Sequence, residues 1–216
     1  MPDEQPMRVA GTAVVLRDGA AGLETLMLRR PDRGSFAGAW VFPGGRVDPG
    51  DETDAETETD AARRAAARET LEEAGIGIRD LTLLSCWTPP VEQPVKYRTW
   101  FFLARFAEGD VHANPGEIEE AVWLTPAQAF AKHVAGELTL FPPTWMTLRF
   151  LLPHATVDES LAAAGDLELF ATRMGSDERG RFVMWEGDEH YPDRPGTPGA
   201  RHRLLMGALP WEYRRR

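Results

Sequence analysis

The sequence predicts an α/β protein, on three observations. An alanine-rich stretch at residues 62–76 has charged and apolar residues at helical spacing, and a Thr-Pro pair at 125–126 has the form of a helix N-cap followed by an N1 proline. Four further stretches have the apolar, β-branched and aromatic content of strands, at residues 9–16, 24–30, 81–87 and 100–106.

Shorter elements complete the expected order. Residues 40–42 form a short strand that leads into Pro43-Gly44-Gly45, and residues 121–124 form another strand. A helix is expected at 143–152, with Leu148, Leu151 and Leu152 as core contacts. In the acidic run 51–60, Thr53 and Glu56 offer a helix capping box.

Length and composition predict one main domain with an appendage. A chain of 216 residues with 43% hydrophobic residues can bury a core and is not expected to be disordered. Periodicity weakens after Pro153, and residues 166–216 are rich in glycine, proline and charge. We therefore expect a domain over 1–165 and an irregular extension over 166–216 with one or two strands. The extension is expected to pack on its own domain or on a partner subunit in a homodimer.

Charge and cysteine content limit the function classes. A net charge of -10 disfavours non-specific binding to nucleic acid or to an anionic membrane. No signal peptide or apolar run of membrane-spanning length is visible. The single cysteine, Cys86, is interpreted as a small apolar strand residue and fits a reducing compartment. A cytoplasmic protein is expected.

Three carboxylates on the predicted helix suggest a metal site. Glu69, Glu72 and Glu73 stand at helical offsets zero, three and four, so they fall on one face. Like charges this close repel one another unless a cation lies between them, and hard ions such as Mg²⁺ take oxygen ligands. The alternative is a solvated helix face. A core-facing stripe of Ala67, Leu71 and Ala74 is expected opposite the carboxylates, with Gly75 at the left-handed C-terminal position.

This stretch resembles the Nudix box, G-x5-E-x7-R-E-U-x-E-E-x-G-U, in which U is aliphatic. The matching residues are Gly45, Arg68, Glu69, Glu72, Glu73, Gly75 and Ile76. Thr70 replaces an aliphatic residue, and the spacer before Arg68 has sixteen residues instead of seven. The resemblance implies a three-layer α/β/α sandwich around a mixed sheet. It also implies hydrolysis of a nucleoside diphosphate linked to another group, with Mg²⁺ or Mn²⁺ as cofactor.

The long spacer leaves two candidates for the acid that pairs with Arg68. Asp51 stands at the family's first Glu when counted from Gly45, and Asp60 when counted back from Arg68. If the insertion is a solvated excursion, Asp51 is the partner. If the insertion extends the helix at its N-terminus, Asp51 moves away and Asp60 takes its place. We favour Asp51, because Asp60 is more than two helical turns from Arg68.

The resemblance also assigns roles within the site. It implies that Glu69, Glu72 and Glu73 are metal ligands, joined by the carbonyl of Gly44 or Gly45. Arg68 then orients a carboxylate. Among three acids in the later loop, Glu117, Glu119 and Glu120, we expect Glu117 to be the general base, because it directly follows the Pro115-Gly116 turn.

Substrate contacts are expected at two places, Arg29-Arg30 and Tyr97-Arg98. The segment FPGGRVDPGD and the stretch from Trp87 to Phe102 resemble the peroxisomal branch of coenzyme A diphosphatases and its bacterial relatives. This implies coenzyme A or an acyl-CoA as substrate. ADP-ribose, dinucleoside polyphosphates and NADH stay open, as does a module that binds a nucleotide without cleaving it.

Overall fold

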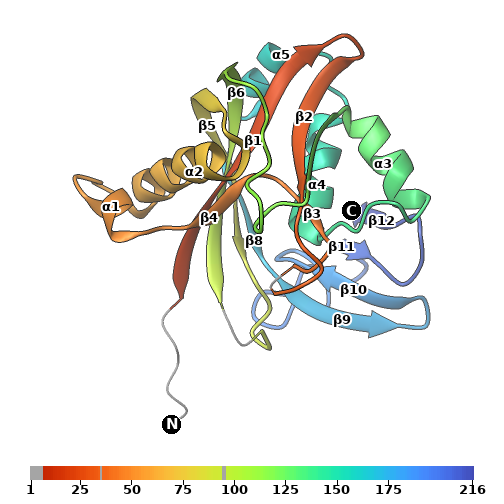
Figure 1. The fold of residues 1–216 in the computed structure, drawn as a ribbon. Helices are drawn as coiled ribbons and strands as arrows, with labels where there is room; N and C mark the ends of the chain where they lie inside the picture. Colours follow the sequence, from red (N-terminus) through yellow and green to blue (C-terminus); the bar gives the residue numbers. More distant parts are fainter. Residues whose placement is uncertain (1–6, 35, 94–95) are drawn as a thin grey trace.

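The computed structural model describes residues 7–34, 36–93 and 96–216. Its main element is a mixed sheet of eight strands (Figure 1). The central path runs β3-β2-β1-β6-β5-β8, while β4 pairs with β1 and β7 pairs with β2. The strands are β1 (Arg8–Gly19), β2 (Gly22–Arg29), β3 (Trp40–Val41), β4 (Gly44–Arg46), β5 (Gly77–Thr88), β6 (Tyr97–Glu108), β7 (Glu120–Leu124) and β8 (Glu168–Ala171).

Helices cover both faces of this sheet, so the expected α/β/α sandwich is confirmed. The long helix α2 (Glu58–Ala74) packs on one face, and α4 (Pro142–Leu151) and α3 (Pro126–Val134) contribute to the core on the other (Figure 1). Two shorter helices are α1 (Pro49–Glu52) and α5 (Val157–Ala163). No helix among the described residues is long and apolar enough to cross a membrane.

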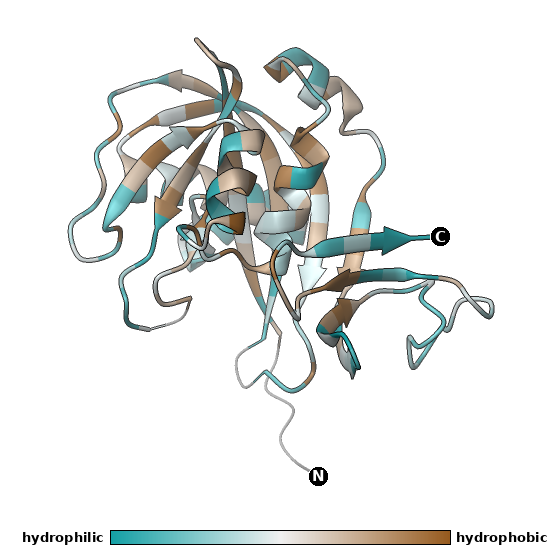
Figure 2. Ribbon diagram, turned by 90° about the vertical axis from the view of Figure 1, so that its right-hand side faces the viewer, coloured by the Kyte–Doolittle hydropathy of each residue, from teal (hydrophilic) through white to brown (hydrophobic). Residues whose placement is uncertain are grey.

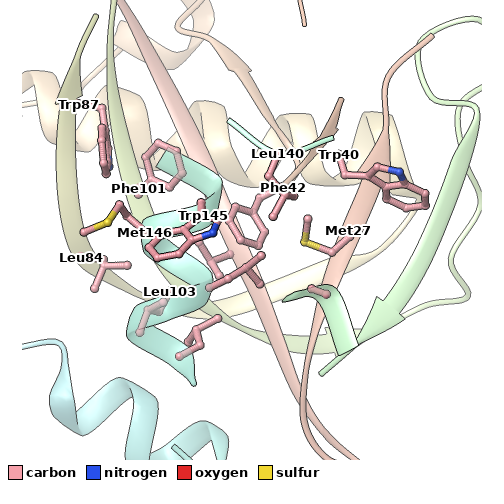
Figure 3. Close-up of a cluster of buried hydrophobic side chains, with 14 of the residues drawn as sticks. Met27, Trp40, Phe42, Leu84, Trp87, Phe101, Leu103, Leu140, Trp145 and Met146 are labelled. Carbon is pink, nitrogen blue, oxygen red and sulfur yellow. The ribbon is translucent and has the colours of Figure 1, made fainter. Parts of the chain in front are cut away.

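Strand β1 divides the two cores because its side chains alternate between faces. Ala13 and Val15 belong to the α2 side, whereas Val14 and Leu16 belong to the α4 side. The strand runs parallel to β6 and antiparallel to β2. The α4-side core is rich in aromatic and sulfur side chains (Figure 3), and hydrophobic residues are concentrated in the strands (Figure 2).

Helix α2 packs through a different stripe from the one expected. Its buried small residues include Ala62, Ala66, Thr70 and Ala74, while Leu71 is 60% exposed. The prediction that Leu71 faces the core is therefore wrong, and Ala67 is only half-buried. The cause is the burial of Glu73, because a helix that turns Glu73 toward the sheet turns Leu71 to the opposite side.

Close approach of α2 to β1 requires a glycine at Gly11. A Cβ there would lie 1.8 Å from the carbonyl oxygen of Ala62. Gly11→Ala should therefore push helix and strand apart and destabilise the protein by about 3 kcal/mol. Gly50→Ala is the matched control, because a Cβ at Gly50 meets nothing within 4 Å. Equal denaturation midpoints for the two variants would show that this contact is not tight.

The inserted residues before Arg68 show features of both arrangements considered from the sequence, a solvated excursion and an extension of the helix. Residues 52–54 and 56–58 are exposed, as a solvated excursion requires, yet α2 begins at Glu58 and so extends the helix. Its N-cap is Thr57, whose side chain accepts from the Asp60 backbone N–H, so the capping box predicted at Thr53 and Glu56 is wrong. Arg64 donates to the carbonyls of Thr53 and Asp54, which fixes the excursion on the helix.

The C-terminal residues are more regular than expected. Strand β8 joins the main sheet parallel to β5, and four more strands form an antiparallel sheet in the order β12-β11-β10-β9. Buried Asp188 and Arg203 pair within this part, and Trp185 lies in the α4-side core. The four strands are β9 (Arg173–Asp177), β10 (Gly180–Met184), β11 (His202–Leu205) and β12 (Glu212–Arg215).

Two smaller expectations have different outcomes. Cys86 is buried in β5, and burial raises the pKa of its thiol to about 11, in agreement with an apolar strand residue. Leu148 and Leu151 are fully buried in α4, but Leu152 is 50% exposed. The helix ends at Leu151, and Leu152 is its C-cap.

Candidate functional site

The glycine loop and the C-terminal half of α2 form one contact surface. Gly45 lies so close to Glu69 that a Cβ would stand 2.2 Å from its Oε1. The backbone N–H of Gly44 donates to Oε2 of Glu73 over 2.9 Å. A Cβ on Gly44 would lie 2.5 Å from the Gly11 carbonyl oxygen, so the loop also sits tightly on β1. These glycines therefore bring two motif carboxylates to the backbone of β4.

Glu73 is the most deeply buried carboxyl of the motif, with 3% of its side chain exposed. Arg30 contacts it over 2.8 Å. Burial raises the pKa of Glu73 to about 7, and the Gly44 N–H and the Arg30 charge offset only part of this effect. Burial also raises the pKa of Glu69. Both carboxyls thus lie where additional positive charge would favour their ionised forms.

The raised pKa of Glu73 predicts a pH dependence of stability. Its folded pKa of about 7 exceeds the ordinary 4.5, so the stabilising contribution is complete below pH 4.5 and is lost as the pH rises through 7. Without metal, the free energy of unfolding should lose about 3 kcal/mol through this group. Urea titrations at several pH values in EDTA should show that Glu73→Gln flattens the decline. Parallel pH profiles for variant and wild type would contradict the assignment.

Arg68 organises the other carboxylates of the motif. It contacts Asp51 through Nη2 over 2.8 Å and through Nε over 3.2 Å. Burial alone would raise the pKa of Asp51, but hydrogen bonds from Arg68 and the Asp48 N–H outweigh it and the pKa is lowered. Asp60 instead accepts from Thr57 and contacts Arg63. The prediction that Asp51 pairs with Arg68 is confirmed.

The same guanidinium lies between two expected metal ligands. Nη1 of Arg68 is 3.0 Å from Oε1 of Glu69 and 2.9 Å from Oε2 of Glu72. Over residues 7–34, 36–93 and 96–216, no three acidic, histidine or cysteine side chains are gathered closely enough to hold a metal. Arg68 and Arg30 provide the positive charge in this arrangement.

The donor chemistry nevertheless fits a hard divalent ion. Glu73 is buried and Glu69 is partly buried, both have a raised pKa, and both lie against the glycines of β4, where there is no room for a side chain. Oxygen ligands of this kind are those that Mg²⁺ and Mn²⁺ take. Glu72 is half exposed and one helical turn from Glu69.

The loop that carries the predicted general base packs on the end of α2. The Asn114 backbone N–H donates to the Glu73 carbonyl over 3.0 Å, and buried Ile118 anchors the loop. Glu117 is exposed and close enough to contribute to the raised pKa of Glu73. Glu119 pairs with Arg29 over 2.7 Å instead. Of the three loop acids, Glu117 is thus the one with an electrostatic link to the motif helix.

The expected substrate contacts lie at two separate places. Arg29 and Arg30 lie beside the motif, and a cleft of about 440 Å³ next to them is lined by Pro31, Asp32, Arg33, Gly116 and Glu119. Tyr97 and Arg98 lie at the start of β6, where Arg98 contacts Glu58 over 3.1 Å. Glu58 and Glu73 are fifteen residues apart, about 22 Å along a helix. The structure therefore does not bring the two pairs together.

Arg33 is a residue of the cleft that the sequence did not single out. It donates to the Gly116 carbonyl over 3.4 Å and forms no ion pair with the residues that the structure describes. Its neighbours in sequence, Arg29 and Arg30, both have carboxylate partners. A third arginine just after a strand end was the available signal.

The family described as the NUDIX domain matches residues 7–143 of this chain. The chain belongs to the Nudix family. It is a Nudix hydrolase, and members of this family act on nucleoside diphosphate derivatives and generally use divalent metal ions. The matched region contains the whole site described above, from β1 to the start of α4.

Similar proteins agree with this placement. A NUDIX hydrolase from Alicyclobacillus acidocaldarius is 25% identical, with a TM-score of 0.65 over 76% of this chain and 100% of that one. A MutT NUDIX hydrolase from Burkholderia pseudomallei is 26% identical, with a TM-score of 0.52 over 67% and 98%. The NAD-capped RNA hydrolase NudC of Deinococcus radiodurans is 32% identical over 108 residues, which are 50% of this chain. This Nudix chain covers only 32% of that relative's length.

Proposed function

We propose that this Nudix hydrolase cleaves the diphosphate of coenzyme A or an acyl-CoA by attack of water. The observation that carries the hydrolytic part is the convergence of Glu69 and Glu73 on the Gly44–Gly45 turn, with Arg68 held by Asp51. Coenzyme A as the substrate is supported by the resemblance of FPGGRVDPGD and the Trp87–Phe102 stretch to coenzyme A diphosphatases.

In this proposal each residue has a separate task. Glu69, Glu72 and Glu73, with the Gly45 carbonyl, would hold a divalent cation, which when bound would neutralise diphosphate charge and make water more acidic. Asp51 keeps Arg68 oriented toward Glu69 and Glu72. Glu117 accepts the proton of the attacking water from the exposed side of the loop.

Arg33 lines the cleft and has no carboxylate partner in the part of the chain that the structure describes, which suggests how the substrate is selected. Coenzyme A carries a 3′-phosphate besides its diphosphate, and the guanidinium of Arg33 suits such a phosphate. We expect wild type to prefer coenzyme A over dephospho-coenzyme A by about tenfold in kcat/KM. Arg33→Met should remove the preference, whereas Arg79→Met, an exposed arginine outside the cleft, should keep it.

A second candidate substrate is a nicotinamide dinucleotide, favoured by the 32% identity to a protein named NAD-capped RNA hydrolase. The two candidates are separated by measuring kcat/KM for coenzyme A, NADH and ADP-ribose with Mg²⁺ or Mn²⁺. Faster cleavage of NADH than of coenzyme A would overturn the coenzyme A proposal. Equal rates on coenzyme A and dephospho-coenzyme A would remove only the role of Arg33.

A further inference from the structure

We propose that a hollow between α3, α4 and the residues just before β12 binds a small aromatic acid. The hollow has a volume of about 470 Å³, within the usual range for small-molecule sites. Its side chains Trp145 and Phe130 pack with the core on the α4 side of the sheet, whereas the motif helix α2 packs on the other side. It is therefore a separate site from the proposed hydrolytic centre.

The walls of the hollow are aromatic. Phe130 and Trp145 meet edge to face, with ring centroids 5.2 Å apart. Trp211 stands edge to face on His133, with centroids 4.8 Å apart. Rings arranged at steep angles offer both faces and edges to a planar ligand, and such contacts add to the burial of apolar area. A flat aromatic ring is the shape that these walls fit.

His133 is one of the lining residues of the hollow. Only 4% of this residue is exposed, and its Nδ1 donates to the Leu138 carbonyl oxygen over 2.9 Å. Nε2 is enclosed and has no hydrogen-bond partner among the described residues. The ring is therefore fixed by its own chain and supports the side chain of Trp211.

Arg149 gives the hollow a positive charge at its edge. Its guanidinium lies over the ring of Tyr213, 4.8 Å from the centroid, and no carboxylate in the described part of the chain pairs with it. A planar guanidinium held on an aromatic ring matches the geometry of a carboxylate. In a chain of net charge -10, such a local cation is needed to attract an anion. Together, the aromatic walls and the cation select an aromatic ring that carries a carboxylate.

Three related probes test these features on the full chain. Indole-3-acetate has the ring, the N–H and the carboxylate, naphthalene-1-acetate lacks the N–H, and indole-3-acetamide lacks the charge. We expect indole-3-acetate to bind by isothermal titration calorimetry with a Kd of about 0.1–1 mM. Naphthalene-1-acetate keeps the ring and the charge and should bind about as tightly, whereas indole-3-acetamide should bind about fivefold more weakly.

Two variants and one control variant test which residues are responsible for the binding. Arg149→Met keeps the packed stem and should bind indole-3-acetate no more tightly than wild type binds indole-3-acetamide. Trp211→Ala removes a wall and should weaken all three probes. Arg181→Met, which changes an exposed arginine on β10, should bind like wild type.

The wild-type comparison alone can overturn the proposal, so it does not depend on the folding of any variant. No heat of binding for indole-3-acetate at millimolar concentration would exclude the site. Equal affinity for the acetate and the acetamide would exclude the role of Arg149. Absence of binding by naphthalene-1-acetate would contradict selection by ring and charge. Because binding is the readout, none of these results bears on the hydrolytic proposal.

Discussion

Replacing Glu72 with glutamine is expected to lower kcat by about two to four orders of magnitude. A metal ion contributes several kcal/mol to stabilising transition-state charge, and each 1.4 kcal/mol is a factor of ten. Glu72 is 51% exposed and its structural contact is the ion pair with Arg68. The loss of that pair should change the free energy of unfolding by less than about 0.5 kcal/mol. Steady-state kinetics and urea unfolding of the same preparation separate the two effects.

Glu56→Gln is the matched control for this variant. Glu56 is an exposed acid in the insertion, so the control loses the same charge away from the motif. It should keep wild-type kcat. If Glu72→Gln turned over at the wild-type rate, Glu72 would have to be removed from the proposed metal ligands. A large loss of stability in Glu72→Gln would instead indicate a structural role.

Asp51→Asn is expected to impair activity by one to two orders of magnitude, more than Asp60→Asn does. Asp51 is buried and binds Arg68 through both carboxylate oxygens, so the change leaves Arg68 free to bind Glu69 and Glu72 more closely. Breaking a buried pair of this kind costs about 2 kcal/mol or more of stability. Asp60 lies on the first turn of α2 and has no contact with Arg68.

The ranking of these two variants is the decisive comparison, and kcat/KM measured at saturating metal is the readout. Asp51→Glu serves as a conservative control, because it restores the charge with the family's usual residue at this position. It should retain most of the activity. If Asp60→Asn were the more damaging change, the ion pair of Arg68 with Asp51 would not be the one that supports catalysis.

The motif and its immediate neighbours could be predicted from the sequence because their chemistry is local. Gly75 adopts φ 71° as the helix C-cap, as expected from its place after the last helical residue. The Thr125-Pro126 pair forms the expected N-cap and N1 of α3. The choice of Asp51 over Asp60 followed from the length of a helical turn alone. The two helix caps depend only on neighbours in sequence, and the choice of Asp51 depends on regular helix geometry.

The orientation of α2 could not be predicted in the same way. The expectation that the three carboxylates share one face placed Leu71 in the core on the opposite face, whereas the structure buries Glu73 and exposes Leu71. Glu73 can be buried because the Gly44 N–H and Arg30 satisfy it, and both come from elsewhere in the chain. Burial of an acid depends on partners that helical periodicity does not reveal.

Pairing between residues that are distant in sequence also explains the other differences between the expected and the observed structure. Arg98 was expected near the substrate, but the extended start of α2 brings Glu58 to it instead. The glycine-rich C-terminal residues form a four-stranded sheet because Asp188 pairs with Arg203 and also accepts from two backbone N–H groups. Such a buried ion pair fixes strands whose sequences have little apolar periodicity.

Metal-dependent cleavage of a diphosphate can be measured directly by phosphorus NMR. The full chain is incubated with coenzyme A and Mg²⁺ or Mn²⁺, and the products are resolved by their phosphorus signals. We expect the diphosphate signal to disappear and two phosphomonoester signals to replace it, with adenosine 3′,5′-bisphosphate as one product. We also expect EDTA to stop the reaction and added metal to restore it. Intact diphosphate with coenzyme A, NADH and ADP-ribose alike, in a protein that nevertheless binds one of them, would contradict hydrolysis and show a nucleotide-binding module.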